Sequence, residues 1–570
     1  RPCDSCRKRK SRCVTEGESS VCVLCKFHGQ PCTYEEAPKP RKRNASRDGE
    51  RSNAASPVKR SLAFKTIPGT GVEEYDTLPG PSLLKRTLGL QNLHHSQYIG
   101  RHEVPDPYGA PYAASSDGAK RAKKSDDLEI VVRPVHPSHA FRIIPDPTTE
   151  GYSEQRGWID DIEAAVYPHG NHLVQLYFRI IHPSFPILHQ QVFLEKYARS
   201  YREFSPPLLA AVYLAACGYW RYSEHLIDYE RPDLTKLRHL AFASFRATVM
   251  RPKLSTVQAG LLLAQYEATD KHGWINGQQS KLAHQLVDLA YTLGLHLDAR
   301  HWEIPDWEIG LRRRIGWAVY MQDKWTALLH GRPSLISAHD WCVPPLDEDD
   351  FPEIEEDDRE GSAEVEKSRL VFMQMASLTE ILSGVLVDVF SARSQQMLDA
   401  AVGDKIGLLL TWVKPWQLHL RNWFSSLPES LRMDTAASMK LSPVGYLRLA
   451  YLTLETCIHR HIIRTLAMSE TVDPNLVRAC RAAGKDRLIN AVDFLQRLQA
   501  QHLASFWYYI SSKCCALIHA FGQSLAASAL DPAERAFYEQ KVKEFRWTLK
   551  VNSEAGTGFM KQAIGMLDIS

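Results

Sequence analysis

The 570-residue sequence predicts an all-α fold in which a small cysteine-rich module and a flexible linker precede a large helical domain. Three observations support this prediction. Six of the 12 cysteines lie within the first 32 residues. Residues 36–157 are punctuated by Pro, Ser, Gly and basic residues, as linkers are. From residue 158 onward, apolar residues recur at the i, i+3 and i+4 positions of amphipathic helices, and alternating strand-like runs are nearly absent.

The cysteine-rich module, residues 1–35, repeats the spacing C-x2-C-x6-C twice. Its cysteines are Cys3, Cys6, Cys13, Cys22, Cys25 and Cys32. A C-x2-C pair directs two thiolates at one metal ion, and Zn2+ favours such sulfur ligands in tetrahedral geometry. Two separate zinc sites would need eight ligands, so two of the six sulfurs must be shared. The duplication makes the equivalent residues Cys3 and Cys22 the natural bridges. One ion would then bind Cys3, Cys6, Cys13 and Cys22, and the other Cys3, Cys22, Cys25 and Cys32.

A disulfide framework is the alternative interpretation of six closely spaced cysteines. Two features favour zinc: no signal peptide or transmembrane run is visible, and the remaining cysteines lie mostly in apolar helical sequence. The module is also shorter than the ~40 residues below which a domain usually needs a metal or disulfides to fold. Zinc would therefore serve as its core.

The charge of the chain is strongly asymmetric. Residues 1–60 contain 15 Lys/Arg and 7 Asp/Glu, a net charge of +8, whereas the whole chain is only +3. A basic end on a mildly acidic body indicates an arm that binds nucleic acid. Five of the six residues between the second and third cysteines are basic: Arg7, Lys8, Arg9, Lys10 and Arg12. Because a metal-binding turn encloses this run, we expect it to be a contact surface.

The segments Cys3–Cys13 and Gly29–Tyr34 resemble the fungal Zn2Cys6 binuclear zinc cluster, a DNA-binding domain. The resemblance implies a short helix whose tip enters the major groove, where Arg9 and Lys10 would read a CCG-type triplet. Arginine and lysine donate to guanine O6 and N7, which makes this reading physically reasonable. The other three basic residues would mostly contact phosphates, which position a domain without reading sequence.

Two departures from the usual zinc-cluster sequence leave questions open. Residues 14–21 lack the proline that many members carry before the fourth cysteine, which bears on the rigidity of that loop. Residues 36–125 show no sustained heptad pattern, so a homodimer or heterodimer remains possible but unsupported.

The linker carries three basic clusters, near residues 39–43, 58–60 and 121–124. We interpret these clusters either as nuclear import signals or as segments that contact phosphates or aid solubility. The linker also contains short apolar patches at residues 83–84, 88–93 and 130–132, which could dock onto the helical domain.

The helical domain is predicted over residues 158–530, with a C-terminal helical extension over 531–570. Its periodic apolar segments are 172–181, 208–220, 261–266, 282–295, 370–390, 408–420, 447–463, 488–503 and 506–525. Proline at the first helical position predicts helix starts at Ser205–Pro207 and at Asp473–Pro474.

Several motifs in this domain resemble the fungus-specific regulatory region, or middle homology region, that accompanies zinc clusters. They occur in the expected order over about residues 165–520: Leu176–Phe178, His182–His189, Ala290–His296, Leu311–Trp317 and Gly331–Ser334. Residues Trp302–Glu308 and Tyr320–Trp325 resemble activators of nitrogen-source catabolism, such as allantoin and GABA use.

Two other features have both a structural and a functional interpretation. Tryptophans 302, 307, 317, 325 and 341 fit core packing better than a ligand pocket. If the domain had an inducer pocket, we would expect it beside these tryptophans and Arg312, Arg314, Asp323 and Arg332. The acidic run 347–360 fits a solvated loop better than a coactivator surface or a decoy for the basic module.

The sequence as a whole predicts a nuclear, zinc-dependent transcription factor that binds double-stranded DNA at RNA polymerase II genes. We expect it to activate transcription. Its expected partners are coactivators or a second transcription factor, and no membrane. No catalytic motif with supporting context is present, so we do not expect an enzyme. The alternative is a promoter-tethered coregulator, whose zinc cluster is structural and whose helical domain binds a partner factor.

Overall fold

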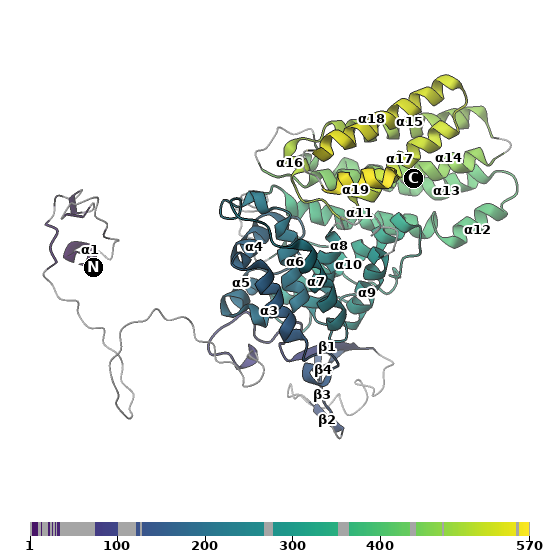
Figure 1. Cartoon of the computed structure of the whole chain (residues 1–570). Helices are drawn as coiled ribbons and strands as arrows, with labels where there is room; N and C mark the ends of the chain where they lie inside the picture. Colours follow the sequence, from purple (N-terminus) through teal and green to yellow (C-terminus); the bar gives the residue numbers. More distant parts are fainter. Residues whose placement is uncertain are drawn as a thin grey trace. The chain divides into compact units, whose positions relative to one another are not determined.

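The structure is a computed structural model that describes most of the C-terminal part of the chain and selected residues of the N-terminal part. The described residues are 3–8, 13, 21–22, 25–26, 29, 31–34, 75–100, 121–125, 128–266, 278–351, 364–433, 440–469, 472–554 and 558–568. The chain divides into two compact units, Arg1–Ala63 and Phe64–Ser570. Each unit is described by itself (Figure 1).

The N-terminal unit has cysteine sulfurs where a larger domain has an apolar core. Its helix α1 spans Asp4–Lys8 and carries an acidic residue in its first turn, which the helix dipole favours. The backbone N–H of Asp4 donates to the carbonyl of Thr33 at 2.7 Å, and the Thr33 hydroxyl donates to the Asp4 carboxylate at 3.0 Å. These two bonds tie the first helix to the last described turn of the unit.

The C-terminal unit is built almost entirely of helices, as the sequence predicts. The first group comprises α3 (Gln155–Val166), α4 (Gly170–Leu176), α5 (Gln190–Arg199), α6 (Pro206–Cys217), α7 (Leu234–Thr248), α8 (Leu254–Gln265), α9 (Gln278–Thr292) and α10 (Asp306–His330). The second comprises α11 (Ser368–Asp388), α12 (Ala392–Ala400), α13 (Lys405–Ser426), α14 (Val444–Ala467), α15 (Pro474–Gln496), α16 (Ala500–Leu503), α17 (Ser511–Ala527), α18 (Pro532–Glu554) and α19 (Gly558–Leu567). Figure 1 shows these two groups as neighbouring layers, with the C-terminal helices α18 and α19 packed on α17.

Short turns connect or extend these helices. They are η1 (Tyr75–Thr77), η2 (Asp146–Thr148), η3 (Tyr177–Ile181, a π-helical turn after α4), η4 (Tyr201–Glu203), η5 (Trp220–Tyr222), η6 (Glu348–Asp350) and η8 (Glu429–Leu431). Both predicted helix starts are confirmed, because Pro206 opens α6 and Pro474 opens α15. At α15 the Asp473 carboxylate also caps the helix by accepting from the N–H of Asn475.

Helix α10 is the central element of the unit and joins the two layers. It packs against α8 and α9 on one side and α11 and α17 on the other, and 20 of its 25 residues are buried. The prediction that its tryptophans are core residues is confirmed: Trp307, Trp317 and Trp325 are all buried. The helix ends at Gly331, whose φ of 60° lies in the left-handed region that favours glycine.

A four-stranded antiparallel sheet is the main feature that the sequence analysis does not predict. Its strands are β1 (His94–Ile99), β2 (Arg121–Ser125), β3 (Leu128–His136) and β4 (His139–Pro145), in the order β1-β4-β3-β2. Buried Val135, Phe141 and Ile143 of the sheet pack with Trp302 and Ile304, which precede α10. This part of the chain therefore differs from the flexible linker expected over residues 36–157. Its strands contain histidines, a proline and charged residues, which obscure the alternating pattern.

The segment before the sheet is fastened to α10 through a buried carboxylate. Glu308, fully buried, accepts hydrogen bonds from the backbone N–H groups of Leu88 at 2.9 Å and Gly89 at 3.0 Å. The same carboxylate pairs with Arg312 at 2.9 Å, and Arg312 also donates to the carbonyl of Leu293 at 2.9 Å. Leu84 and Leu88 are buried, which confirms that apolar patches of the predicted linker dock on the helical domain.

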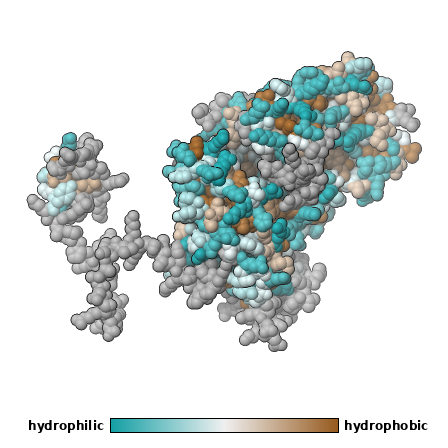
Figure 2. All heavy atoms as spheres, viewed as in Figure 1, coloured by the Kyte–Doolittle hydropathy of each residue, from teal (hydrophilic) through white to brown (hydrophobic). Residues whose placement is uncertain are grey.

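One helix, α11, is long and apolar enough to cross a membrane by length and composition. Half of its most apolar window is buried, and the helix packs against α10, α13 and α14, as a core helix does. Figure 2 shows hydrophilic residues dominating the visible face of the unit, with hydrophobic residues scattered among them.

The buried Glu308–Arg312 pair gives a direct test of this architecture. Glu308→Gln leaves the Arg312 charge buried without its counter-ion, a change that typically costs about 3–5 kcal/mol of unfolding free energy. Urea unfolding of the full chain, followed by circular dichroism, should show that loss. Glu303→Gln is the matched control, because Glu303 is exposed on the segment just before α10 and should change stability by less than about 0.5 kcal/mol. Equal stability of the two variants would show that this pair does not fasten the segment.

Candidate zinc centre and nucleic-acid interface

Four of the six predicted zinc ligands form a tight sulfur cluster. Cys3, Cys6, Cys22 and Cys25 are buried, and their sulfur atoms lie within 4.8 Å of one another. The Sγ–Sγ distances are 3.8 Å for Cys3–Cys22, 3.5 Å for Cys3–Cys25 and 3.6 Å for Cys6–Cys22. A tetrahedral zinc with Zn–S bonds of ~2.3 Å separates its sulfurs by about 3.8 Å. The three contacts therefore fit pairs of ligands that share an ion.

The two halves of the module repeat the same backbone geometry around their sulfurs. In each half, the N–H of the second cysteine lies 3.4 Å from the sulfur of the first: Cys6 to Cys3, and Cys25 to Cys22. The N–H of the first cysteine lies 3.4 Å from the sulfur of the third: Cys3 to Cys13, and Cys22 to Cys32. Cys3 and Cys22 are thus structurally equivalent, and each contacts the sulfurs of both C-x2-C residues of the opposite half. This is the position that a bridging ligand must occupy.

The buried, closely spaced positions of the sulfurs change the pKa values of their thiols. Loss of hydration, followed by hydrogen bonding to Cys3 and Cys22, raises the pKa of the Cys6 thiol to about 12. The backbone N–H of Cys25 instead lowers the pKa of Cys22 to about 6. Neighbouring thiolates therefore do not all form readily without a compensating cation. Zn2+ supplies that charge, and binding it releases the protons of the thiols.

The predicted DNA contacts begin on α1. Arg7 and Lys8 are its last two residues and directly follow Cys6. Arg9, Lys10 and Arg12 lie outside the described residues. The equivalent position of the second half is Lys26, which is exposed and follows Cys25. Residues 26–31 contain no other lysine or arginine, so the basic run belongs to the first half alone.

The polar residues beside the tryptophans bind one another, which agrees with the prediction that this region is core and not a ligand pocket. Arg312 is held by Glu308, and the guanidinium of Arg314 lies 5.3 Å from the ring centre of Phe351. The Asp323 carboxylate accepts from the Ser334 hydroxyl at 2.5 Å and from the N–H of Leu335 at 3.0 Å. The guanidinium of Arg332 donates to the Ser280 hydroxyl at 3.1 Å. These residues stabilise the ends and surroundings of α10.

The beginning of the acidic run 347–360 is attached to the domain. Arg313 of α10 pairs with Asp347 at 3.1 Å and with Asp350 at 2.8 Å, and Phe351 is buried. Residues 347–349 are exposed, as expected of a solvated loop, whereas Asp350 and Phe351 are buried. Residues 352–360 lie outside the described part of the chain.

Comparisons with known proteins agree with both parts of this description. Residues 1–41 match the family model of the fungal Zn(2)-Cys(6) binuclear cluster domain, and residues 174–425 match the fungal specific transcription factor domain. Together the two matches cover just over half of the chain. The chain therefore carries the zinc-cluster domain and the regulatory domain of fungal transcription factors, and its matches are to transcriptional regulators and not to enzymes. Its cofactor is accordingly a pair of Zn2+ ions held by the N-terminal cysteines.

Three curated relatives illustrate the similarity. The transcriptional activator protein DAL81 of Saccharomyces cerevisiae is 32% identical over 97% of this chain and 59% of its own length. The activatory protein CHA4 of the same yeast is 21% identical, covering 77% of this chain and 69% of its own length. The acetamidase regulatory protein of Aspergillus fumigatus is 24% identical, covering 55% of this chain and 37% of its own length. This chain thus spans about three fifths of DAL81. No solved structure matches the chain.

Shared sulfurs make a specific prediction about metal content. The full-length protein should contain two zinc ions by native mass spectrometry. Cys3→Ser removes a ligand common to both ions and should lose both, with unfolding of the N-terminal unit. Cys342→Ser, at an exposed cysteine of the C-terminal unit, is the matched control and should retain two. A Cys3→Ser protein that still binds two zinc ions would contradict the bridging assignment.

Proposed function

We propose that the protein is a nuclear activator of RNA polymerase II genes that reads a CCG-type DNA triplet through its zinc-held N-terminal unit. The observation that carries the proposal is the placement of α1. This helix contains Cys6 of the sulfur cluster and ends at the first basic residues of the run. Metal binding would therefore fix the orientation of the residues that meet DNA.

Contacts with DNA bases and contacts with DNA phosphates contribute differently to the free energy of binding. Arg9 and Lys10 are assigned to guanine O6 and N7, where each good contact contributes about 1–3 kcal/mol of discrimination. Arg7, Lys8 and Arg12 are assigned to phosphates, which supply affinity that falls as salt rises. The all-helical C-terminal unit would then serve regulation, by binding coactivators or a partner factor. Dimerisation is not required by any described contact.

We further propose that the genes regulated by the protein serve the use of nitrogen compounds. The resemblance of residues 302–308 and 320–325 to activators of nitrogen-source catabolism supports this part. So does the similarity to a protein named as a regulator of acetamidase. The basic clusters of residues 39–43 and 58–60 are assigned to nuclear import.

Substitution of Lys10 tests the assignment of base reading. Lys10→Ala should weaken binding to a selected CCG site about 5- to 100-fold and leave binding to unrelated DNA nearly unchanged, because one base contact is lost. Fluorescence anisotropy at several fixed salt concentrations measures both affinities.

Lys26→Ala is the matched control, since Lys26 occupies the second half of the module and should affect both kinds of DNA only slightly. An equal loss on specific and unrelated DNA in Lys10→Ala would assign Lys10 to phosphate instead.

A further inference from the structure

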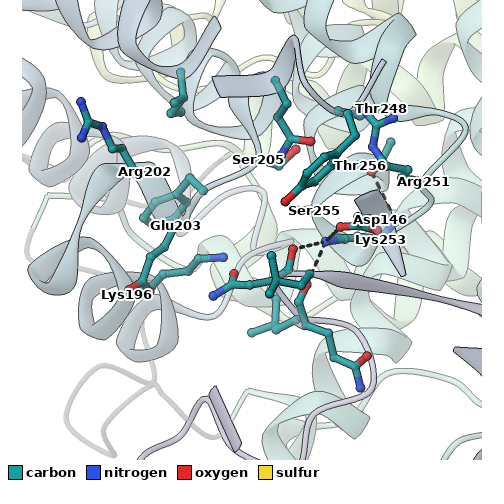
Figure 3. A pocket seen from close by; sticks show the side chains of 18 of the residues that line it. Asp146, Lys196, Arg202, Glu203, Ser205, Thr248, Arg251, Lys253, Ser255 and Thr256 are labelled. Atoms are coloured by element: carbon teal, nitrogen blue, oxygen red, sulfur yellow. Dashed lines mark hydrogen bonds and ion pairs between the residues drawn. The ribbon is translucent and has the colours of Figure 1, made fainter. Parts of the chain in front are cut away.

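The C-terminal unit contains a cavity of about 290 Å3 that lies away from the tryptophans of α10. Its wall combines residues 89–93 with α3, the end of α5, the turn η4 and the start of α8 (Figure 3). Ile159 and Phe204 contribute apolar surface, and seven of the 20 lining residues are charged. The volume is at the lower limit of small-molecule pockets, so it suits a ligand of few heavy atoms.

The acidic side chains of the wall are already neutralised by bases. Asp146 pairs with Lys253 at 2.5 Å and is hydrogen-bonded to His95 at 2.8 Å, and these two partners outweigh the opposing effect of burial and lower the pKa of Asp146. Asp160 pairs with Arg202 at 2.9 Å. The remaining acid, Glu203, pairs with Arg199 at 3.0 Å.

Two basic side chains of the wall lack such a partner. Arg251 donates to the backbone carbonyl of Glu150 at 2.6 Å and to the Thr149 hydroxyl at 3.3 Å, which are neutral groups. Lys196 is only 8% exposed, and no hydrogen bond or ion pair to its ammonium occurs within the described part of the chain. The rings of Tyr75 and Phe204 lie 5.5 and 5.0 Å from the nitrogen, and Glu203 attracts the ammonium without forming an ion pair with it in the described part of the chain.

The Lys196 side chain points into the cavity, so a ligand bound there could supply the partner that its ammonium lacks. Figure 3 shows its side chain leaving α5 and ending towards the middle of the pocket, opposite the Asp146–Lys253 pair. Burial lowers the pKa of Lys196 to about 7, because loss of hydration disfavours the ammonium more than the nearby carboxylate of Glu203 stabilises it. Buried charges in proteins are normally paired, so an anion is the group that this position lacks.

Helix geometry adds to the positive potential of the cavity. The first turn of α8 carries Ser255 and Thr256 into the wall, and a helix N-terminus favours negative charge. The Ser255 hydroxyl makes no hydrogen bond within the described residues and can donate to a ligand.

We propose that this cavity binds a small monocarboxylate, whose carboxylate pairs with Lys196 and whose short apolar body lies against Ile159 and Phe204. The Lys196 ammonium can pair with one carboxylate, whereas the Arg251 guanidinium is already bound by neutral acceptors. A dianion such as phosphate would bring its second charge close to Glu203, which already interacts with Lys196. The site is independent of the DNA-reading proposal, because every described residue that lines it belongs to the unit Phe64–Ser570.

The test uses the full-length zinc-loaded protein and isothermal titration calorimetry with three probes: butyrate, its neutral isostere butyramide, and inorganic phosphate. Butyrate should bind saturably with one site per chain, and at least tenfold more tightly than butyramide or phosphate. Lys196→Met keeps the apolar stem of the side chain and should weaken butyrate binding at least tenfold. Lys513→Met is the matched control, since Lys513 is a partly buried lysine on α17 beside His330 and outside the cavity.

The comparison of butyrate with butyramide on the unaltered protein decides the proposal even if Lys196→Met fails to fold. Equal binding of these two probes, no binding of either, or preferential binding of phosphate would each overturn it. Retained butyrate affinity in a folded Lys196→Met protein would also overturn it. Affinity for DNA in the absence of probe should be the same in Lys196→Met and the unaltered protein, which keeps this test separate from that of DNA reading.

Discussion

The N-terminal unit depends on one constraint: four sulfur atoms lie within 4.8 Å of one another where a larger domain would have an apolar core. Loss of hydration, and then hydrogen bonding to the neighbouring sulfurs, raises the pKa of Cys6 to about 12. A cation must therefore be present before the cluster is stable as thiolates. Because α1 contains one ligand and starts the basic run, the proposed function implies that the metal that folds the unit also orients its contacts with DNA. Zinc affinity and DNA affinity are thus linked through a helix of five residues.

The C-terminal unit follows a different principle, in which buried ion pairs hold a helical body to the chain that precedes it. Glu308 and Arg312 fasten residues 88–89 to α10, and Asp146 fastens the end of the sheet to Lys253 at the start of α8. Such pairs are costly to bury and costly to break, which makes them good determinants of a single arrangement. Lys196, by contrast, is buried and has no ion pair or hydrogen bond to its ammonium among the described residues, which makes it a candidate for ligand binding.

Much of the zinc centre and of the helical fold could be predicted from the sequence, because their signals are local. The C-x2-C-x6-C repeat implies shared sulfurs by ligand counting alone, and Asp473–Pro474 marks a helix start by chemistry within two residues. The sheet, α10 and the cavity could not be predicted in this way. Polar residues obscure the alternation of the strands, and α10 buries Glu308 and Arg312–Arg314, so it lacks a plain apolar stripe. The cavity joins residues that lie more than 150 positions apart, such as Gln91 and Lys253.

The most direct test of the account is selection of binding sites from random double-stranded DNA at a fixed salt concentration. The full-length protein would be compared with and without chelation of its zinc. The account predicts enrichment of a CCG-type triplet that disappears when zinc is removed, and the spacing of recovered triplets would report any dimer. A promoter-tethered coregulator would enrich no common triplet. That result, or an enriched sequence that survives removal of zinc, would contradict the central claim that the zinc-held basic run reads DNA.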